Sequence, residues 1–70
     1  MKVYTVEKVI DMGNHVVKIA NSRDLAEEIL FELEMLRIQK LERNCRELGI
    51  EPAAWQYKTQ HEIYEHTLEE

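Results

Sequence analysis

The residues with the most chemical potential form one short cluster near the C-terminus, the run His61-Glu62-Ile63-Tyr64-Glu65-His66. A zinc-protease helix carries two histidines at i,i+4 spacing, so that both face one metal ion. Here the spacing is one residue longer, which turns the two histidines about 140° apart on a helix. We therefore expect a solvated helix face and no metal. The alternative is a two-ligand site, made by His61 with Glu65 or by Glu62 with His66.

Other catalytic groupings are absent or incomplete. A third metal ligand would have to come from His15, Cys45 or another chain. Cys45 could be paired with a histidine as a nucleophile, but no orienting group or oxyanion site accompanies it. The sequence also lacks a glycine-rich phosphate loop, a G-x-S-x-G motif and a C-x-x-C motif. It therefore predicts a protein that is not an enzyme and has no cofactor.

Positive charge is concentrated in four residues, Arg37, Lys40, Arg43 and Arg46. One interpretation is a strip that binds phosphates or an acidic partner. The other is that these side chains complement the helix dipole and form intrahelical pairs such as Glu42–Arg46. We favour the second interpretation because acidic residues are interleaved with the basic ones.

A single amphipathic helix over residues 22–48 dominates the sequence, since its apolar residues recur at three- and four-residue steps. Asn21 and Ser22 are good N-caps. Gly49 suits a left-handed residue after the last turn, with Ile50 completing a Schellman motif. Pro52 then prevents the helix from continuing.

This helix has two apolar stripes, so it requires two partners. The first stripe is Leu25, Ile29, Leu33 and Leu36, and the second is Phe31, Met35, Ile38 and Cys45. We expect the first stripe to cover a β-hairpin at residues 2–20, which is rich in Val, Ile, Tyr and Thr. Gly13-Asn14 is the expected type II′ turn of that hairpin. Its buried face would include Val6 and Ile19.

Residues 52–68 read as a shorter second helix, with Pro52 at its first position and aromatic residues toward the core. The predicted fold is therefore α+β, with a ββαα order in one small domain spanning residues 1–70. A helix of this length folding back from Pro52 would cover Cys45 and Ile38 but leave Phe31 open. We therefore expect a homodimer that meets through the second stripe.

Composition narrows the function. The net charge is −5, and residues 51–70 alone carry −4, so nucleic acid is an unfavourable partner. No signal-peptide pattern or membrane-spanning run is present, and the single cysteine suits a reducing compartment, so we expect a cytoplasmic protein.

The leading functional prediction is a small acidic, non-enzymatic module that regulates or inhibits another protein. Phage-type inhibitors of a host nuclease or defence complex are one such class. The carboxylates expected to contact the partner are Glu27, Glu28, Glu32, Glu34, Glu62, Glu65, Glu69 and Glu70. The alternative is a nucleic-acid-binding transcriptional regulator that uses the hairpin face or the Arg37/Lys40/Arg43/Arg46 strip.

Overall fold

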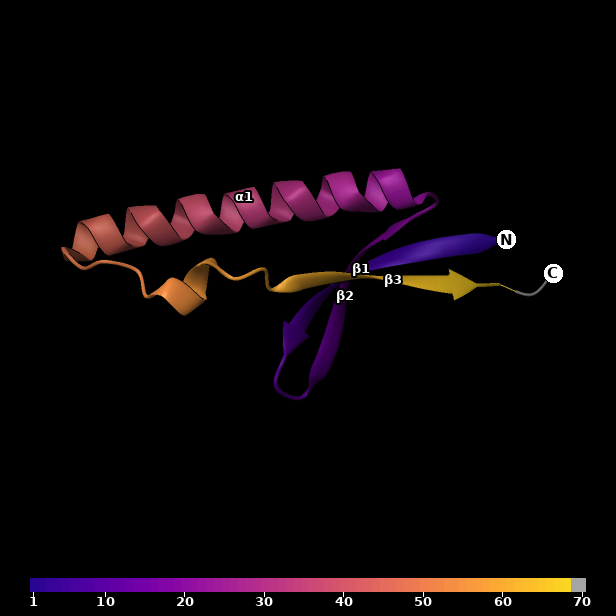
Figure 1. Cartoon of the computed structure of the whole chain (residues 1–70), viewed down its shortest axis with the longest axis horizontal. Coiled ribbons are helices and arrows are strands. Elements are labelled where there is room, and N and C mark those ends of the chain that lie inside the picture. Colours follow the sequence, from indigo (N-terminus) through magenta and orange to yellow (C-terminus); the bar gives the residue numbers. More distant parts are fainter. Residues whose placement is uncertain (69–70) are drawn as a thin grey trace.

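The fold is a three-stranded antiparallel sheet with one long helix on one of its faces (Figure 1). The computed structural model describes residues 1–68. The elements follow one another as β1 (Lys2–Ile10), β2 (Gly13–Ala20), α1 (Arg23–Leu48), the 3-10 turn η1 (Ala54–Tyr57) and β3 (His61–Thr67). The strand order is β2-β1-β3, so the last strand pairs with the first and β1 lies in the centre.

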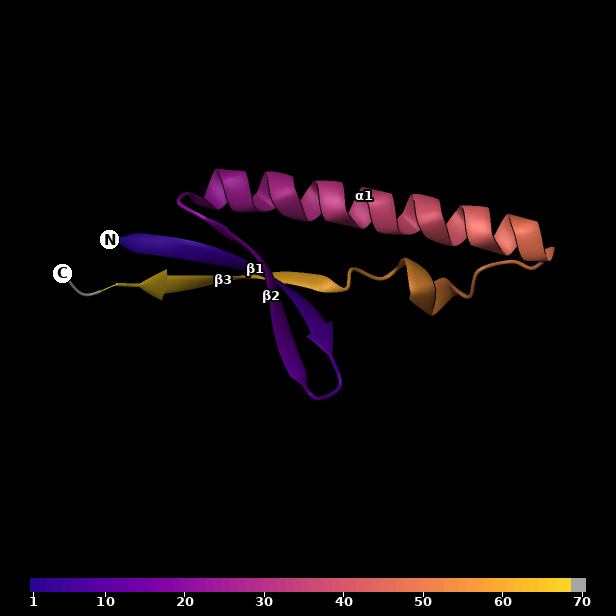
Figure 2. The same cartoon turned by 180° about the vertical axis from the view of Figure 1, so that it is seen from behind.

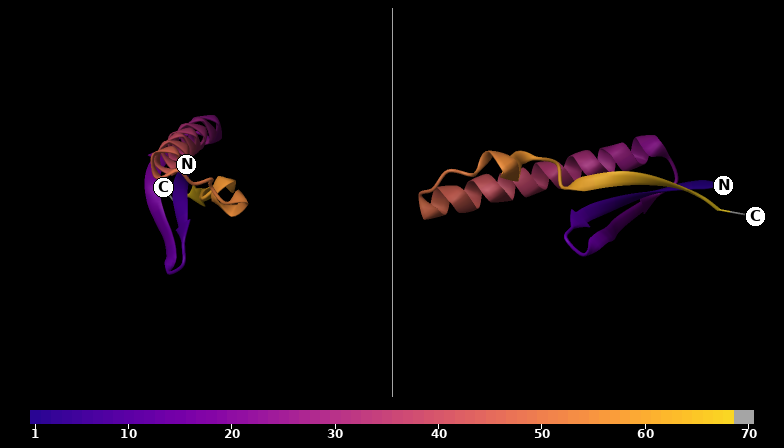
Figure 3. Two further views of the ribbon diagram at one scale, coloured as in Figure 1. Left: turned by 90° about the vertical axis from the view of Figure 1, so that its left-hand side faces the viewer. Right: turned by 60° about the horizontal axis from the view of Figure 1, so that its bottom comes forward.

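Figures 1 and 2 show α1 running along the sheet and continuing past it toward η1. Figure 3 shows that α1 lies on one side only. The opposite side of the sheet, called the open face below, is not covered by any element of residues 1–68. It carries Thr5, Glu7, Val16, Ile19 and Tyr64.

The expected second helix over residues 52–68, and with it the ββαα order, is wrong. Residues 61–67 form β3, which pairs antiparallel with β1 and places Ile63 opposite Val6. Only residues 54–57 are helical, as one 3-10 turn. The physical reason is that a two-stranded hairpin is marginal alone, whereas a third strand satisfies the second edge of β1. Ile63 points toward the helix and Tyr64 toward the open face, as successive side chains of a strand do.

The predicted hairpin turn is also wrong. Asp11 and Met12 form the turn, and Gly13 is already the first residue of β2, opposite Ile10. Gly13 has φ 119°, a conformation that favours glycine. A β-bulge between Val6 and Glu7 shifts the register again, so Ile19 pairs with Thr5 on the open face. Ile19 is consequently 68% exposed instead of buried.

The ends of α1 follow from their local sequence. Ser22 accepts a hydrogen bond through its Oγ from the Leu25 amide at 3.2 Å. At the other end Gly49 adopts a left-handed conformation, with φ 71°. The Ile50 amide donates to the Cys45 carbonyl at 2.9 Å, which is the bond of a Schellman motif. The predicted caps are therefore the ones that the helix uses.

The core is small and lies under the N-terminal half of α1. Val6, Ala20 and Ala26 are its buried members. Half-buried neighbours surround them: Tyr4, Ile29, Leu30, Leu33 and Ile63. A helix of this length extends about 39 Å, whereas β3 extends only about 24 Å, so the sheet does not reach the C-terminal half of α1.

The molecule is unusually elongated for its size. Its principal extents are 54 × 25 × 15 Å and its radius of gyration is 14.7 Å, where a compact domain of this length has about 11 Å. Its accessible surface is 5742 Å², whereas a compact monomer of this mass exposes about 4,600 Å². Much apolar surface is therefore left uncovered by the chain itself. None of the helices in residues 1–68 combines the length and apolar character needed to cross a membrane.

The core assignment predicts a contrast between two valines on opposite faces of the sheet, Val6 on the helix-facing side and Val16 on the open face. Val6→Ala should lower the free energy of unfolding by about 2 kcal/mol, because it removes fully buried methyl groups. Val16→Ala on the open face should cost less than about 0.5 kcal/mol. Urea denaturation monitored by circular dichroism measures both values. Equal costs at the two positions would show that the core lies elsewhere.

Candidate functional site

A half-buried carboxylate, Glu34, joins α1 to the chain that leads into β3. One oxygen, Oε1, accepts from Arg37 Nη2 at 2.8 Å and from Arg37 Nε at 3.1 Å. The other oxygen, Oε2, accepts from the Gln60 amide at 3.2 Å and bonds to His61 Nδ1. These bonds lie between α1, which carries Glu34, and the helix-facing side of the sheet, which carries His61. We call these four residues the Glu34 junction.

Arg37 extends the junction to η1. Its Nη1 donates to the Gln56 carbonyl at 2.7 Å, and its Nη2 donates to the Lys58 carbonyl at 2.9 Å. The guanidinium therefore satisfies two backbone acceptors of a segment with no buried side chain in its 3-10 turn. This segment lies along the C-terminal half of α1 because of these bonds.

The junction keeps Glu34 ionised. Burial by itself raises the pKa of this carboxyl, but hydrogen bonds from Arg37, His61 and the Gln60 amide outweigh it and lower the pKa below its ordinary value. Both carboxylate oxygens of Glu34 thus accept hydrogen bonds from groups of the same chain.

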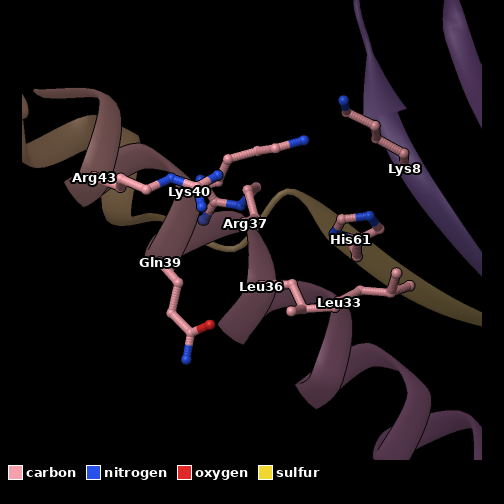
Figure 4. Close-up of a pocket in the computed structure, with 8 residues that line it drawn as sticks. All are labelled: Lys8, Leu33, Leu36, Arg37, Gln39, Lys40, Arg43 and His61. Carbon is pink, nitrogen blue, oxygen red and sulfur yellow. The ribbon is translucent and has the colours of Figure 1, made fainter. Parts of the chain in front are cut away.

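Beside the junction is an open groove of about 600 Å³ (Figure 4). The groove is lined by Lys8, Leu33, Leu36, Arg37, Gln39, Lys40, Arg43 and His61. Four of these eight side chains are lysine or arginine, and none is a carboxylate. Such a surface attracts anions.

A second polar network lies on the open face of the sheet. Thr5 Oγ1 and His66 Nε2 are 3.0 Å apart, and Thr5 also donates to Glu7. Nearby, Asn14 Nδ2 donates to the Tyr64 hydroxyl at 3.0 Å. These bonds give the centre of the open face a polar character between its exposed valines.

The predicted interface stripe of α1 is divided by the structure. Phe31 and Met35 are 63% and 46% exposed. Ile38 is half-buried and Cys45 is buried. The exposed part of the stripe is therefore its N-terminal half.

The predicted contact carboxylates on α1 differ in their availability. Glu28 and Glu32 are exposed and form no ion pair within residues 1–68. Glu27 pairs with Arg23 at 3.3 Å on the surface. Glu34 lies in the junction, as described above. Glu28 and Glu32 are the two carboxylates next to Phe31 that remain free.

The C-terminal carboxylates lie on β3. Glu62 accepts from the Tyr64 hydroxyl. Glu65 pairs with Lys2 at 3.2 Å, and the hydrogen bond from this lysine lowers the pKa of Glu65. Glu69 and Glu70 lie outside the described residues.

The histidines of the C-terminal cluster point to opposite sides of the sheet. His61 faces α1 in the junction, whereas His66 bonds to Thr5 on the open face. No group of three residues able to hold a metal ion is found in the part of the chain that the structure describes. The strand geometry separates the two histidines because their spacing is odd.

The four basic residues of the predicted strip also separate. Arg37 is held by the junction, Lys40 and Arg43 line the groove, and Arg46 lies outside it. Sequence reasoning missed Lys8, which approaches the groove from β1. The available signal was that Lys8 follows Val6 by two residues, so that an alternating strand places this lysine on the same face as the predicted core valine.

The junction predicts a pH-dependent stability. Because the folded-state pKa of Glu34 is lowered, its stabilising effect is complete well above its ordinary pKa of 4.5 and is lost as the pH falls through the folded-state pKa. Glu34→Gln should therefore lower the free energy of unfolding by about 1–3 kcal/mol at pH 7. The difference from the wild type should shrink at pH 3.

Urea denaturation at the two pH values measures this effect. Glu32→Gln is the matched control, since Glu32 is an exposed glutamate on the same helix. It should change stability by less than about 0.5 kcal/mol at either pH. A Glu34→Gln effect that is the same at pH 3 and pH 7 would contradict an ionised junction.

Comparison of the chain with protein-family models matched no family. Searches of curated proteins and of solved structures likewise gave no match. Its function is therefore inferred from its own residues, their geometry and their charge.

Proposed function

We propose that this chain is a non-enzymatic protein-binding module that works as a homodimer and regulates another protein by covering part of its surface. The observation that supports this most is the excess of accessible surface. The chain exposes about 1,100 Å² more than a compact monomer of its mass. A standard protein interface buries about 800 Å² on each partner. The uncovered area is therefore of the size that a stable interface requires.

The interface that we propose is the outer face of α1, formed by Glu28, Phe31, Met35 and Arg46. Phe31 and Met35 lie one turn apart, and both are exposed. Large apolar side chains at the centre with charged residues around them are the usual anatomy of an interface. Ala26, on the other side of the helix, is fully buried against the sheet.

Charge along this face favours a second copy as the occupant. Glu28 and Arg46 lie five helical turns apart, so they share one side of α1 about 27 Å from each other. In an antiparallel pair of helices, Glu28 of each copy comes opposite Arg46 of the other, with Met35 near the two-fold axis. Such an isologous contact is self-complementary in both charge and apolar surface.

The open face of the sheet is the competing surface, since Val16 and Ile19 are also exposed. Its centre, however, is occupied by the Thr5–Glu7–His66 hydrogen bonds. Burial of these polar groups in a dimer would need new partners for them. The outer face of α1 carries no such network.

Regulation of a further protein builds on the acidic character of the chain. Glu32 remains unpaired beside the outer face, and the net charge of −5 suits a basic protein surface. That the regulated protein is a nuclease or a defence complex, inhibited by this chain, stays a prediction. Nucleic acid as the partner is disfavoured by the same net charge.

The dimer is tested by light scattering at tens of micromolar protein. The wild type should give about twice the 8.4 kDa mass of the chain. Phe31→Glu should give a monomer with an unchanged circular dichroism spectrum. Met12→Glu is the matched control, because Met12 lies in the hairpin turn and is also exposed; it should remain a dimer. A wild-type species of 8.4 kDa would refute the proposal.

The antiparallel arrangement is tested by exchanging charges. Glu28→Arg and Arg46→Glu should each weaken the dimer, because each places like charges opposite one another. The double variant restores the opposite-charge pairs and should restore dimerisation toward the wild-type level. Sedimentation equilibrium measures all three dissociation constants. Additive weakening in the double variant would contradict this arrangement.

A further inference from the structure

The groove beside the Glu34 junction concentrates positive charge in an acidic protein. It contains four of the nine lysine and arginine residues of the chain and no carboxylate side chain. The remaining charge of the molecule is strongly negative, so the groove is an isolated positive site. A fixed cluster of this sign attracts anions and disfavours cations.

Three of the four cations are free to bind a ligand. Arg37 is already bonded to Glu34 and to two backbone carbonyls. Lys8, Lys40 and Arg43 form no ion pair with any residue in the range 1–68. Figure 4 shows Lys8 and Lys40 extending from opposite sides toward the same gap. An anion in this gap would relieve the repulsion between the two ammonium groups.

The groove also has an apolar wall, formed by Leu33 and Leu36. Leu36 is 63% exposed, although it belongs to the stripe expected to cover the sheet. A volume of about 600 Å³ exceeds what a bare inorganic anion fills and lies in the range of small-molecule sites. A ligand with both an anionic group and an apolar body therefore fits this surface.

We propose that this groove binds a small organic phosphate. The phosphate lies between Lys8 and Lys40, with Arg43 nearby, and the apolar body rests on Leu36. Phosphate suits the site because its oxygens accept from several cationic donors at once. His61 bonds to Glu34 through Nδ1 and also lines the groove. The Glu34 junction thus fixes one wall of the site without occupying it.

Binding is tested by NMR titration of the uniformly ¹⁵N-labelled full chain with phenyl phosphate, inorganic phosphate and benzyl alcohol. Phenyl phosphate should bind most tightly and should shift the amide resonances of Lys8, Leu36 and Lys40. Benzyl alcohol, which lacks the phosphate, should cause no such shifts. The proposal would be overturned if saturating phenyl phosphate shifted only resonances outside the groove. Equal binding of benzyl alcohol would overturn it as well.

Variants separate the charge from the apolar wall. Lys40→Gln should weaken phenyl phosphate binding about tenfold. The matched control is Lys18→Gln, which removes the same charge from β2 outside the groove and should leave the affinity unchanged. Leu36→Ala should weaken binding of phenyl phosphate but not of inorganic phosphate. Equal losses in Lys40→Gln and Lys18→Gln would mean that only the overall charge matters and would refute the site.

An oligothymidylate of eight nucleotides distinguishes a free organic phosphate from nucleic acid. Because the surface outside the groove is acidic, this strand should bind no more tightly than phenyl phosphate. Much tighter binding of the strand through Lys8 and Lys40, without binding of phenyl phosphate, would overturn the proposal in favour of a nucleic-acid site.

Discussion

The hydrogen bonds of the Glu34 carboxylate are the interaction on which the arrangement of the C-terminal third of the chain depends. That part of the chain contributes little to the core, since up to residue 68 Ile63 is its one hydrophobic residue packed against Val6 and Ala26. Glu34 instead holds it by polar bonds, directly to Gln60 and His61 and through Arg37 to the backbone of residues 56 and 58. With these bonds in place, β3 reaches β1 in the observed register and completes the sheet. Without them, few contacts would hold the segment between α1 and β3 against the helix.

The same junction explains why the groove and the outer face of α1 lie apart. It draws the returning chain to one side of α1, where Cys45 becomes buried and the groove acquires the His61 wall. Phe31 and Met35, on the outer face, remain uncovered by this segment. Among residues 1–68, no segment covers this side of α1. We propose that a second copy covers this side.

Local sequence signals allowed the long helix to be predicted. Features that depend on contacts between residues far apart in the sequence could not be predicted. Ser22, Gly49 and Ile50 act within one turn of the helix ends, so their roles can be read from sequence. The strand at residues 61–67 depends on pairing with β1, some sixty residues earlier, and its mixed residues suit a helix almost as well. For the same reason, neither the Glu34–His61 bond nor the shared groove of Lys8 and Lys40 could be foreseen. The Glu34–Arg37 spacing was the one local sign of the junction.

The claim that α1 meets a second copy through its outer face is tested most directly by isotope-filtered NOE spectroscopy on an equimolar mixture of ¹³C-labelled and unlabelled chains. The antiparallel arrangement predicts intermolecular contacts from the Met35 methyl group to the middle of the other α1, around Gln39. It predicts none from Val16 or Ile19 on the open face of the sheet. Intermolecular contacts confined to the open face, or none at all at a concentration where the protein is dimeric, would contradict it.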